Sequence, residues 1–295
     1  MRETFYRETT ALLDRDPRTA LVLADISASA FADAAAAHPD RVRNVGIREQ
    51  LMIGVAGGLS LTGLRPFVHS YAPFLVERAW EQIKLDLSHQ GASAVLVSVG
   101  ASHDASSAGR THQAPGDVAL LDTLADWRIH VPGHRDELRP MLRAAASGSE
   151  NVYIRLSSRG NRRAHAHTSG GDLVPIRHGD RGVVIAVGPM LEPTLAATAG
   201  LNLTIAYTNT PRPFDVAGLR ALAVGTEAVV LVEPYLAGTS AWVVSQALAG
   251  VPHRLLALGV SRKELHRYGT PEDHDHAQGL DPGSLRAAIA VHIGG

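Results

Sequence analysis

The stretch from Asn44 to Gly63, NVGIREQLMIGVAGGLSLTG, places a carboxyl and an amide at the head of an apolar, glycine-containing run. Glu49 and Gln50 would lie in the first turn of a helix that carries no further charge, so the helix must be buried. Glu49 could be a cap, because a carboxylate at a helix start interacts well with free N–H groups. It could also do chemistry: burial should raise the pKa of its carboxyl, which could then share a proton with a ring nitrogen of a bound heterocycle.

Aromatic and imidazole side chains follow at positions where they could complete such a site. Tyr71 and Phe74 are three residues apart at a predicted strand-to-helix junction, where they could stack on a flat ring or simply belong to the core. His112 lies in AGRTHQAPGD, Ala108–Asp117, a predicted loop after a strand. Ligands of parallel sheets bind at the carboxyl ends of strands, and a histidine there can give or take a proton near pH 7.

The elements that must position these groups alternate between apolar strands and helical segments. The predicted strands are Thr19–Asp25, Arg65–Tyr71, Ser93–Gly100, Arg128–Gly133, Asn151–Leu156, Gly182–Pro189, Asn202–Asn209, Ala228–Tyr235 and His253–Gly259. The predicted helices are Glu3–Arg15, Arg48–Leu61, Val76–His89, Gly116–Ala125, Arg135–Ala146 and Pro282–Ile293. This alternation predicts α/β architecture, with mostly parallel sheets covered by helices. A polar, unperiodic stretch divides it, so we expect two domains, 1–163 and 177–295, joined by a linker at 164–176.

Composition narrows the class of protein. The 295 residues have a formal net charge of −1, with 28 basic and 29 acidic residues, which favours neither nucleic acid nor an anionic membrane as a partner. The absence of cysteine excludes disulfides and cysteine–metal sites. The N-terminus has no apolar stretch of signal-peptide length and no apolar run is long enough to cross a bilayer, so we expect a cytoplasmic protein.

Weaker patterns favour structure over chemistry. AHAH, Ala164–His167, and EDHDHAQG, Glu272–Gly279, contain His-x-His pairs that could hold Zn²⁺ or Ni²⁺. We interpret them as a solvated linker and a solvated loop, because no other ligand is fixed nearby, and so predict no metal ligands among them. Tyr235 is expected to have a packing role.

Taken together, these blocks resemble the transketolase superfamily of thiamine diphosphate enzymes. The segment NVGIREQLMIGVAGGLSLTGLRPFVHSYAPFLVERAWEQI is similar to the core of that family's pyrimidine-binding domain. GRTHQAPGDVALL resembles its THQ loop, YIRLSSRGN resembles the strand and loop that close the domain, and GLDPGSLRAAI resembles the end of the family's C-terminal domain. The resemblance covers essentially the whole chain, so it implies the two-domain arrangement described above.

The resemblance also implies roles for single residues. Glu49 resembles the carboxylate that bonds N1′ of the cofactor's aminopyrimidine and thereby promotes loss of the thiazolium C2 proton. Tyr71 and Phe74 match the aromatics that line the pyrimidine pocket, and Asp25 matches an acidic residue near the cofactor. His112 matches the active-site histidine that handles substrate hydroxyl and carbonyl groups.

Other positions are implied to lie near the substrate. Arg2, Ser29 and Arg159 fall near positions that grip a sugar phosphate in transketolases. The family commonly has Asp-Gly-Pro before THQ, whereas this chain has Ala-Gly-Arg at 108–110. The missing Asp orients a donor hydroxyl in family members, so its loss argues against ordinary sugar-phosphate substrates. Arg110 would favour a carboxylate-bearing substrate if it faces the site, and would do nothing there if it points to solvent.

The family's second half-site is missing from this sequence. Transketolases hold the diphosphate and Mg²⁺ on a separate domain with a GDG motif followed by Asn, whereas GGD at Gly170–Asp172 and Asn202 here look like chance matches. The resemblance therefore implies a split enzyme in which a partner chain carries that domain, as an α₂β₂ assembly. The pair would transfer a two-carbon ketol or acyl unit from a ketose or 2-oxo acid to an aldehyde or related acceptor. The alternatives are the β-subunit of a 2-oxo acid dehydrogenase or decarboxylase, and a non-catalytic regulatory subunit.

Overall fold

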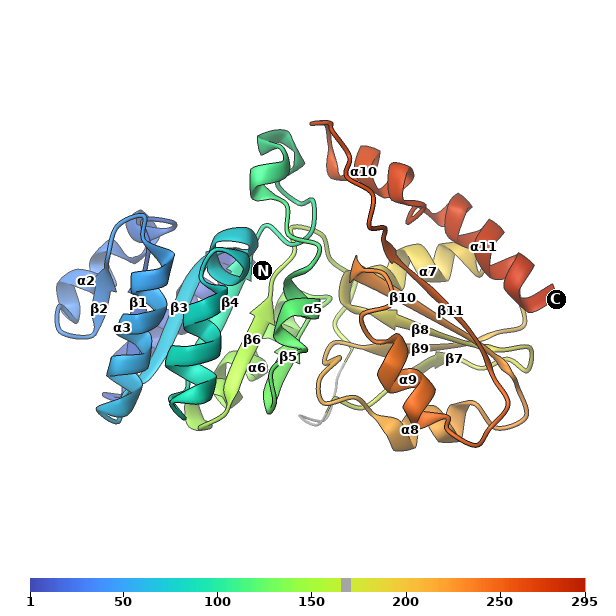
Figure 1. The fold of residues 1–295 in the computed structure, drawn as a ribbon, viewed down its shortest axis with the longest axis horizontal. Helices are drawn as coiled ribbons and strands as arrows, with labels where there is room; N and C mark the ends of the chain where they lie inside the picture. The colour runs from blue at the N-terminus through green and yellow to red at the C-terminus, as the bar shows by residue number, and fades with distance from the viewer. Residues whose placement is uncertain (166–170, 295) are drawn as a thin grey trace.

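The computed structural model describes residues 1–165 and 171–294, which form two sheets, each covered by helices (Figure 1). The first sheet has six strands in the order β2-β1-β3-β4-β6-β5, and every neighbouring pair is parallel. Its strands are β1 (Thr19–Leu23), β2 (Val42–Asn44), β3 (Arg65–Tyr71), β4 (Val95–Val99), β5 (Trp127–His130) and β6 (Asn151–Arg155). The α/β fold class expected from the sequence is confirmed. The three-residue strand β2 was not predicted, because two of its residues are exposed and it lacks an apolar run.

The second sheet has five strands in the order β11-β10-β8-β9-β7. Its strands are β7 (Val174–Arg177), β8 (Val183–Val187), β9 (Thr204–Thr208), β10 (Ala228–Leu236) and β11 (Arg254–Val260). Only the edge strand β7 is antiparallel, to β9, within the described part of the sheet. β7 begins inside the segment 164–176 that the sequence favours as a linker, so this stretch contributes a strand to the second sheet.

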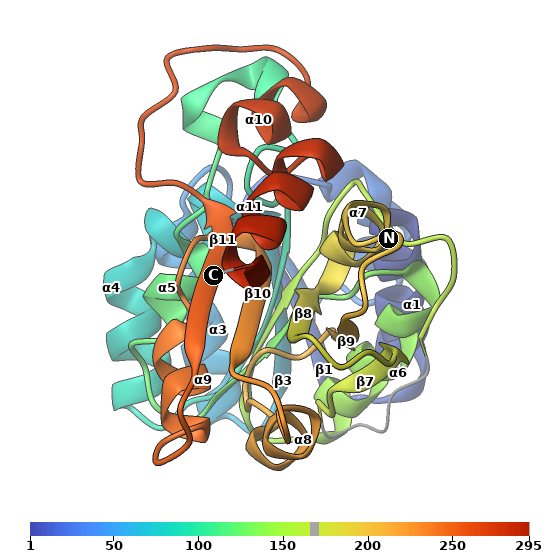
Figure 2. The ribbon, with the colours of Figure 1, turned by 90° about the vertical axis from the view of Figure 1, so that its right-hand side faces the viewer.

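Helices lie on both faces of the first sheet (Figure 2). The helices of the first half are α1 (Arg2–Arg15), α2 (Ala32–Ala37), α3 (Glu49–Leu61), α4 (Trp80–Gln82), α5 (Asp117–Leu121) and α6 (Arg135–Ser147). Those of the second half are α7 (Leu191–Ala197), α8 (Val216–Leu222), α9 (Ala241–Ala247), α10 (Pro271–Gln278) and α11 (Pro282–Gly294). The single helix expected at Val76–His89 is instead the short α4 flanked by π-helical turns at Pro73–Glu77 and Ile83–His89.

Alternating side chains of the strands supply two cores, one on each face of the first sheet. Leu21 and Leu23 of β1 pack with α1 and α6, while Val22 between them packs with α3. This is the pattern of a parallel sheet covered on both sides. Gly57 lets α3 come close to the turn at 83–89, because a Cβ there would lie 2.7 Å from the backbone oxygen of Asp86.

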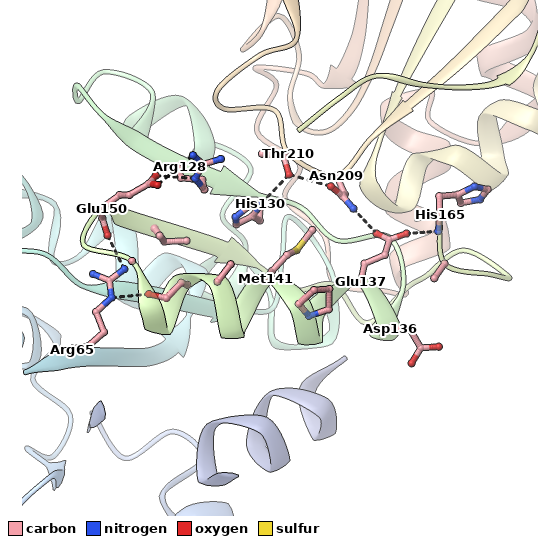
Figure 3. A pocket seen from close by; sticks show the side chains of 16 residues that line it. Arg65, Arg128, His130, Asp136, Glu137, Met141, Glu150, His165, Asn209 and Thr210 are labelled. Atoms are coloured by element: carbon pink, nitrogen blue, oxygen red, sulfur yellow. Dashed lines mark hydrogen bonds and ion pairs between the residues drawn. The ribbon is translucent and has the colours of Figure 1, made fainter. Parts of the chain in front are cut away.

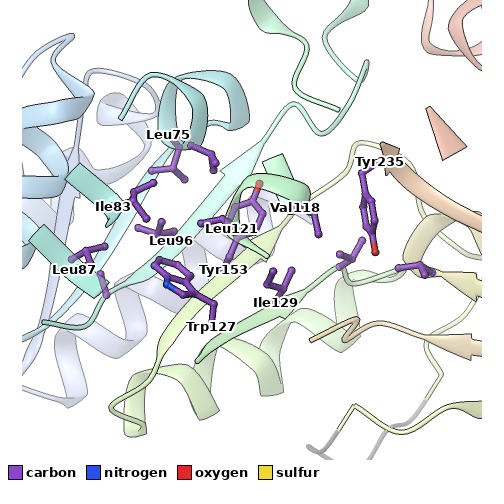
Figure 4. Close-up of a cluster of buried hydrophobic side chains, with 14 of the residues drawn as sticks. Leu75, Ile83, Leu87, Leu96, Val118, Leu121, Trp127, Ile129, Tyr153 and Tyr235 are labelled. Atoms are coloured by element: carbon purple, nitrogen blue, oxygen red, sulfur yellow. The ribbon is translucent and has the colours of Figure 1, made fainter. Parts of the chain in front are cut away.

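One apolar cluster continues from the first half of the chain into the second (Figure 4). Val118, Ile129 and Tyr153 of the first half belong to the same cluster as Tyr235 of β10, whose side chain is fully buried. The packing role expected for Tyr235 is therefore confirmed. The two halves therefore share part of one hydrophobic core.

The prediction that Glu272–Gly279 is a solvated loop is wrong, because most of this segment belongs to helix α10. Thr270 and Asp273 form a capping box at its start, and Pro271 occupies the first helical position. His274 and Asp275 are buried against the first half of the chain. The other His-x-His pair lies partly outside the described residues, since the structure describes it only as far as 165.

Across 1–165 and 171–294, no helix combines the length and apolar character needed to cross a bilayer.

Candidate active site

The chemistry-bearing residues predicted from the sequence lie at one edge of the first sheet. Asp25 follows β1, Glu49 follows β2, Tyr71 ends β3 and His112 follows β4. Since these strands are all parallel, their carboxyl ends share an edge, and ligands of open α/β sheets bind there.

Glu49 is the first residue of α3 and its side chain is 1% exposed. Its Oε2 accepts a hydrogen bond from Nη1 of Arg78 at 2.7 Å. The guanidinium supplies the counter-charge that a buried carboxylate requires, and it leaves Oε1 outside this ion pair. The sequence analysis did not single out Arg78, although it lies in the quoted block and follows the aromatic pair by one helical turn.

Three rings contact one another, and one of them, Phe74, lies against Arg78 of the Arg78–Glu49 pair. The Arg78 guanidinium carbon lies 4.3 Å from the centre of the Phe74 ring. The His112 ring lies 5.0 Å from Phe74 and 5.4 Å from Tyr71, and Tyr71 lies 6.1 Å from Phe74, all in edge-to-face geometry. We call Glu49, Arg78, Tyr71, Phe74 and His112 the ring cluster. Predicted residues from three separate segments therefore meet in space, and all three rings are only partly buried.

Gly100, in the loop directly after β4, leaves space for the Tyr71 ring of this cluster. Gly100 has φ +70°, and a Cβ at this position would lie 2.4 Å from Cδ1 of Tyr71. Both the left-handed backbone and the close approach of the ring require glycine here. The loop after β4 is thus shaped so that the Tyr71 ring can lie against its backbone.

Asp25 lies beside the ring cluster's helix rather than inside the cluster. It has φ +64°, and its carboxylate accepts a hydrogen bond from Nδ2 of Asn44 at 2.9 Å. Oδ1 of Asn44 in turn accepts from the backbone N–H groups of Asp25 and Gly46. This exchange ties the end of β1 to the turn that precedes Glu49. The predicted contact of Asp25 with a cofactor stays a prediction.

Arg2 is hydrogen-bonded to Ser27 and Tyr6. Its guanidinium donates to Oγ of Ser27 at 3.0 Å and to the Tyr6 hydroxyl, whereas Ser29 is exposed. Ser27 also bonds Nε2 of His69 at 3.0 Å, and Nδ1 of His69 lies 2.8 Å from the Val97 carbonyl oxygen. Burial lowers the pKa of His69 to about 4, so this imidazole is neutral near pH 7. The substrate roles of Arg2 and Ser29 remain untested predictions.

The two other predicted arginines are engaged by the second half of the chain. Nε of Arg110 donates to Oε1 of Glu264 at 2.5 Å, and its Nη1 donates to the Gln113 carbonyl at 2.7 Å. Its side chain is half exposed and is held by these contacts, so it does not point freely to solvent. Arg159 forms an ion pair with Asp275 of α10. Whether either arginine touches substrate remains a prediction.

A buried polar network lies next to the THQ loop. The sequence did not lead us to predict it. Oδ2 of Asp117 accepts from Nε of Arg155 at 2.7 Å and from the Tyr153 hydroxyl at 2.6 Å. Arg155 also donates to Oγ of Ser102 at 2.7 Å, and Ser102 donates to the Pro234 carbonyl oxygen of β10. The sequence feature that could have indicated this network is Arg155, the one charged residue in the strand segment NVYIR. The network joins the loop that carries His112 to the second sheet.

Two cavities lie near the junction of the two halves. One of about 590 Å³ is lined by Arg65, His130, Glu137 and Asn209 among others (Figure 3). Its lining runs along α6 from Asp136 to Ala145 and includes no member of the ring cluster. The second, of about 240 Å³, is lined by Glu77, His103, Arg110 and Gln113 together with residues of the C-terminal part. It adjoins the loop of the ring cluster and is the cavity relevant to the site. Within the described residues no three histidine, aspartate or glutamate side chains are grouped to hold a metal ion.

Comparison with known proteins agrees with this geometry. The family description "Transketolase, pyrimidine binding domain" matches residues 1–163, which include every member of the ring cluster. The chain belongs to the transketolase superfamily. It is 54% identical, over 96% of its length, to an uncharacterized 33.6 kDa protein in the fasciation locus of Rhodococcoides fascians, of which it covers 91%.

The chain spans less than half the length of several transketolase-superfamily members that it matches. It is 30% identical, over 86% of its length, to 1-deoxy-D-xylulose-5-phosphate synthase from Thioalkalivibrio sulfidiphilus, but spans only 41% of that protein. Its structure is similar to that of a split gene transketolase in an inactive β4 tetramer, with TM-score 0.84, 26% identity, and 99% and 97% of the two chains covered. Transketolase from Campylobacter jejuni shares the fold at TM-score 0.80 and 15% identity, but the chain covers 46% of it. Homologues in this superfamily use thiamine diphosphate, which fits the ring cluster described above.

Proposed function

We propose that this chain is the pyrimidine-binding subunit of a split, thiamine diphosphate-dependent, transketolase-like enzyme. The observation that carries the proposal is the buried Glu49 carboxyl at the start of α3, whose partner Arg78 lies against Phe74 in a group of three rings from two other segments. A flat, nitrogen-containing heterocycle fits such a setting, because the rings offer stacking faces and the carboxyl offers a proton-sharing oxygen.

Each member of the ring cluster has a distinct task in this proposal. Glu49 exchanges a proton with a ring nitrogen of the aminopyrimidine through Oε1, while Arg78 holds Oε2 and fixes the orientation of the carboxyl. Tyr71 and Phe74 bound the pyrimidine pocket and exclude water from it. His112 gives or takes protons at substrate hydroxyl or carbonyl oxygens. When bound, thiamine diphosphate supplies the carbon that attacks a carbonyl and carries a two-carbon ketol or acyl unit.

We infer that the other half of the cofactor site comes from a second polypeptide. The sequence holds no convincing diphosphate motif, and the chain spans about two fifths of its 1-deoxy-D-xylulose-5-phosphate synthase relatives. By contrast, it matches nearly the full length of the β chain of a split gene transketolase. We therefore place Mg²⁺ and the diphosphate mainly on a partner subunit, in an α₂β₂ assembly with the active site between unlike chains.

Equilibrium binding of thiamine diphosphate tests this proposal. The chain is titrated with the cofactor and Mg²⁺ alone, and then after mixing with a candidate diphosphate-domain chain encoded in the same genome. We expect no saturable binding to the chain alone and at least about 100-fold tighter binding in the mixture, since both half-sites are needed. Tight binding by the isolated chain would overturn the split-site proposal. A mixture that binds no cofactor with any candidate partner would overturn the assigned function.

A further inference from the structure

A buried polar cluster lies where α10 of the second half reaches the loop after β4. Arg159 donates from Nη1 to Oδ2 of Asp275, and its Nε lies 3.9 Å from Oδ1 of Asp104. His103 stacks on His274 with ring centres 5.2 Å apart, and its Nε2 lies 3.9 Å from Oδ1 of Asp275. We call these five residues the Arg159 cluster.

The cluster contains unmet hydrogen-bonding capacity. Nε2 of His103, Nε of Arg159 and Oδ1 of Asp275 are all buried and form no hydrogen bond within the described structure. The side chain of His103 is only 3% exposed. Buried polar atoms are normally satisfied, so three such atoms in one place indicate an imperfect fit. The carboxylate of Asp275 fills the space between Arg159 and His103 without using all the groups that face it.

We propose that Asp275 is a specificity-determining residue whose own carboxylate occupies the anion position on Arg159 and thereby excludes substrates that end in a phosphate. The inference rests on the proposed function, since it assigns the substrate class of that same site. An Asp275 carboxylate in this position favours donor and acceptor substrates that end in uncharged, hydroxylated groups rather than in a phosphate.

Charge explains why a phosphate would be rejected. The single guanidinium of Arg159 faces two carboxylates, those of Asp104 and Asp275. Burial, with His274 and Arg159 nearby, lowers the pKa of His103 to about 3, so its imidazole adds no positive charge near pH 7. A phosphate dianion entering here would meet a carboxylate already bound to the Arg159 guanidinium, and like charges at such distances repel strongly in a low-dielectric setting.

The position of Asp275 is held by its surroundings rather than by the ion pair alone. Ser106 donates to the carbonyl oxygen of Gly269, two residues before α10, at 2.9 Å. The Arg110–Glu264 ion pair binds the same connecting segment nearer to β11. The two views place α10 directly beside the 3₁₀ turns of the loop after β4 (Figure 2). The 240 Å³ cavity is lined by both His103 and His274, so it reaches the cluster from the side of the THQ loop.

Phosphate binding to the isolated chain tests the proposal. Inorganic phosphate is titrated calorimetrically into the wild-type chain, into Asp275→Asn, and into Glu272→Gln, which removes an exposed acid from the same helix with the same change in net charge. We expect Asp275→Asn to bind phosphate at least about tenfold more tightly than wild type. Glu272→Gln should match wild type, and the double variant Asp275→Asn/Arg159→Gln should lose the gain.

Either of two results would overturn the inference. One is wild-type chain that binds phosphate as tightly as Asp275→Asn. The other is a folded Asp275→Asn chain, shown by circular dichroism and thermal melting, that binds no more tightly than Glu272→Gln. If Asp275→Asn does not fold, Asp275→Ser serves the same comparison with a smaller side chain. Because no thiamine diphosphate or partner is present, failure of the proposed function leaves this result intact, and failure here leaves the cofactor titration intact.

Discussion

At the scale of single residues, the site depends on a carboxyl that is both buried and paired. Glu49 lies at a helix start, as a cap would, yet its Oε2 bonds a side chain from another segment, Arg78. The described structure has no side-chain capping hydrogen bond at the start of α3, so the contact with Arg78 fixes this carboxyl. The helix start favours the carboxylate, and we expect the ring cluster to supply the desolvated setting for the proposed proton exchange.

Replacement of Glu49 by Gln tests the proton exchange directly. The amide keeps the shape and leaves Arg78, which is partly exposed, free to bond water. We expect turnover of the assembled enzyme to fall by about 10²- to 10⁴-fold, since proton transfer by a positioned group contributes that much. The thermal midpoint should stay within a few degrees of wild type. Glu81→Gln, at an exposed position on α4, is the matched control and should keep full turnover. Retained activity in Glu49→Gln would exclude the proton-exchange role.

At the scale of elements, α3 has apolar side chains on its outward face as well as its inward one. Met52, Ile53 and Ala56 are buried in the core, while Leu51 and Leu61 are 47% and 62% exposed. A helix that is apolar on all sides is normally buried. Because α3 begins with Glu49, a partner that completes the cofactor site must approach this helix. We therefore expect the exposed face of α3 to contact the partner subunit.

A charge on that face should weaken the assembly without unfolding the chain. We expect Leu51→Asp to raise the dissociation constant of the mixed complex by at least about 30-fold, the effect of roughly 2 kcal/mol at an interface core. Val224→Asp is the control, because Val224 is 81% exposed and lies in the second half of the chain. Sedimentation velocity of the two-chain mixture without cofactor measures both. Equal dissociation constants for the two variants would place the interface elsewhere.

At the scale of the whole molecule, neutral histidines are buried at several sites. Burial lowers the pKa of His69 to about 4 and those of His103 and His130 to about 3. These histidines bind protons readily only when the chain unfolds, so the free energy of unfolding falls as pH drops below the unfolded value of 6.5. Burial of Glu233 acts in the opposite direction, because it raises the pKa of that carboxyl to about 7 and favours the folded state as pH falls from there.

His130 provides the test, since it lies outside the ring cluster and bonds Thr210 across the junction at 2.9 Å. Each such histidine should cost about 2 kcal/mol between pH 6.5 and 5, at about 1.4 kcal/mol per pH unit. We expect urea unfolding of His130→Gln to lose about 2 kcal/mol less than wild type over this pH interval. His276→Gln, at an exposed site, should follow wild type. Identical pH dependence of wild type and His130→Gln would mean that His130 takes up its proton in the folded state.

Local pattern accounts for most of the elements. The apolar runs of β1, β3, β4, β6, β8 and β10 were predictable because each strand is buried on both faces and needs a nearly continuous apolar sequence. β2 and β7 were not predictable from the sequence. Both are short, partly exposed edge strands, which pairing with a neighbouring strand stabilises although they lack an apolar run. α10 was missed because its buried face carries His274 and Asp275, whose polar side chains are accommodated only by the residues of the opposing loop.

What the sequence by itself determined is the set of chemical groups and the family to which the chain belongs. Glu49, Tyr71, Phe74 and His112 were all identified from residue type and order, because parallel strands deliver the residues that follow them to one edge. Only the tertiary structure decided which groups pair. The Arg78–Glu49 contact, the Arg2–Ser27 hydrogen bond and the Arg159–Asp275 ion pair join segments up to 116 residues apart. Such pairs depend on distance and burial, which the folded chain alone defines.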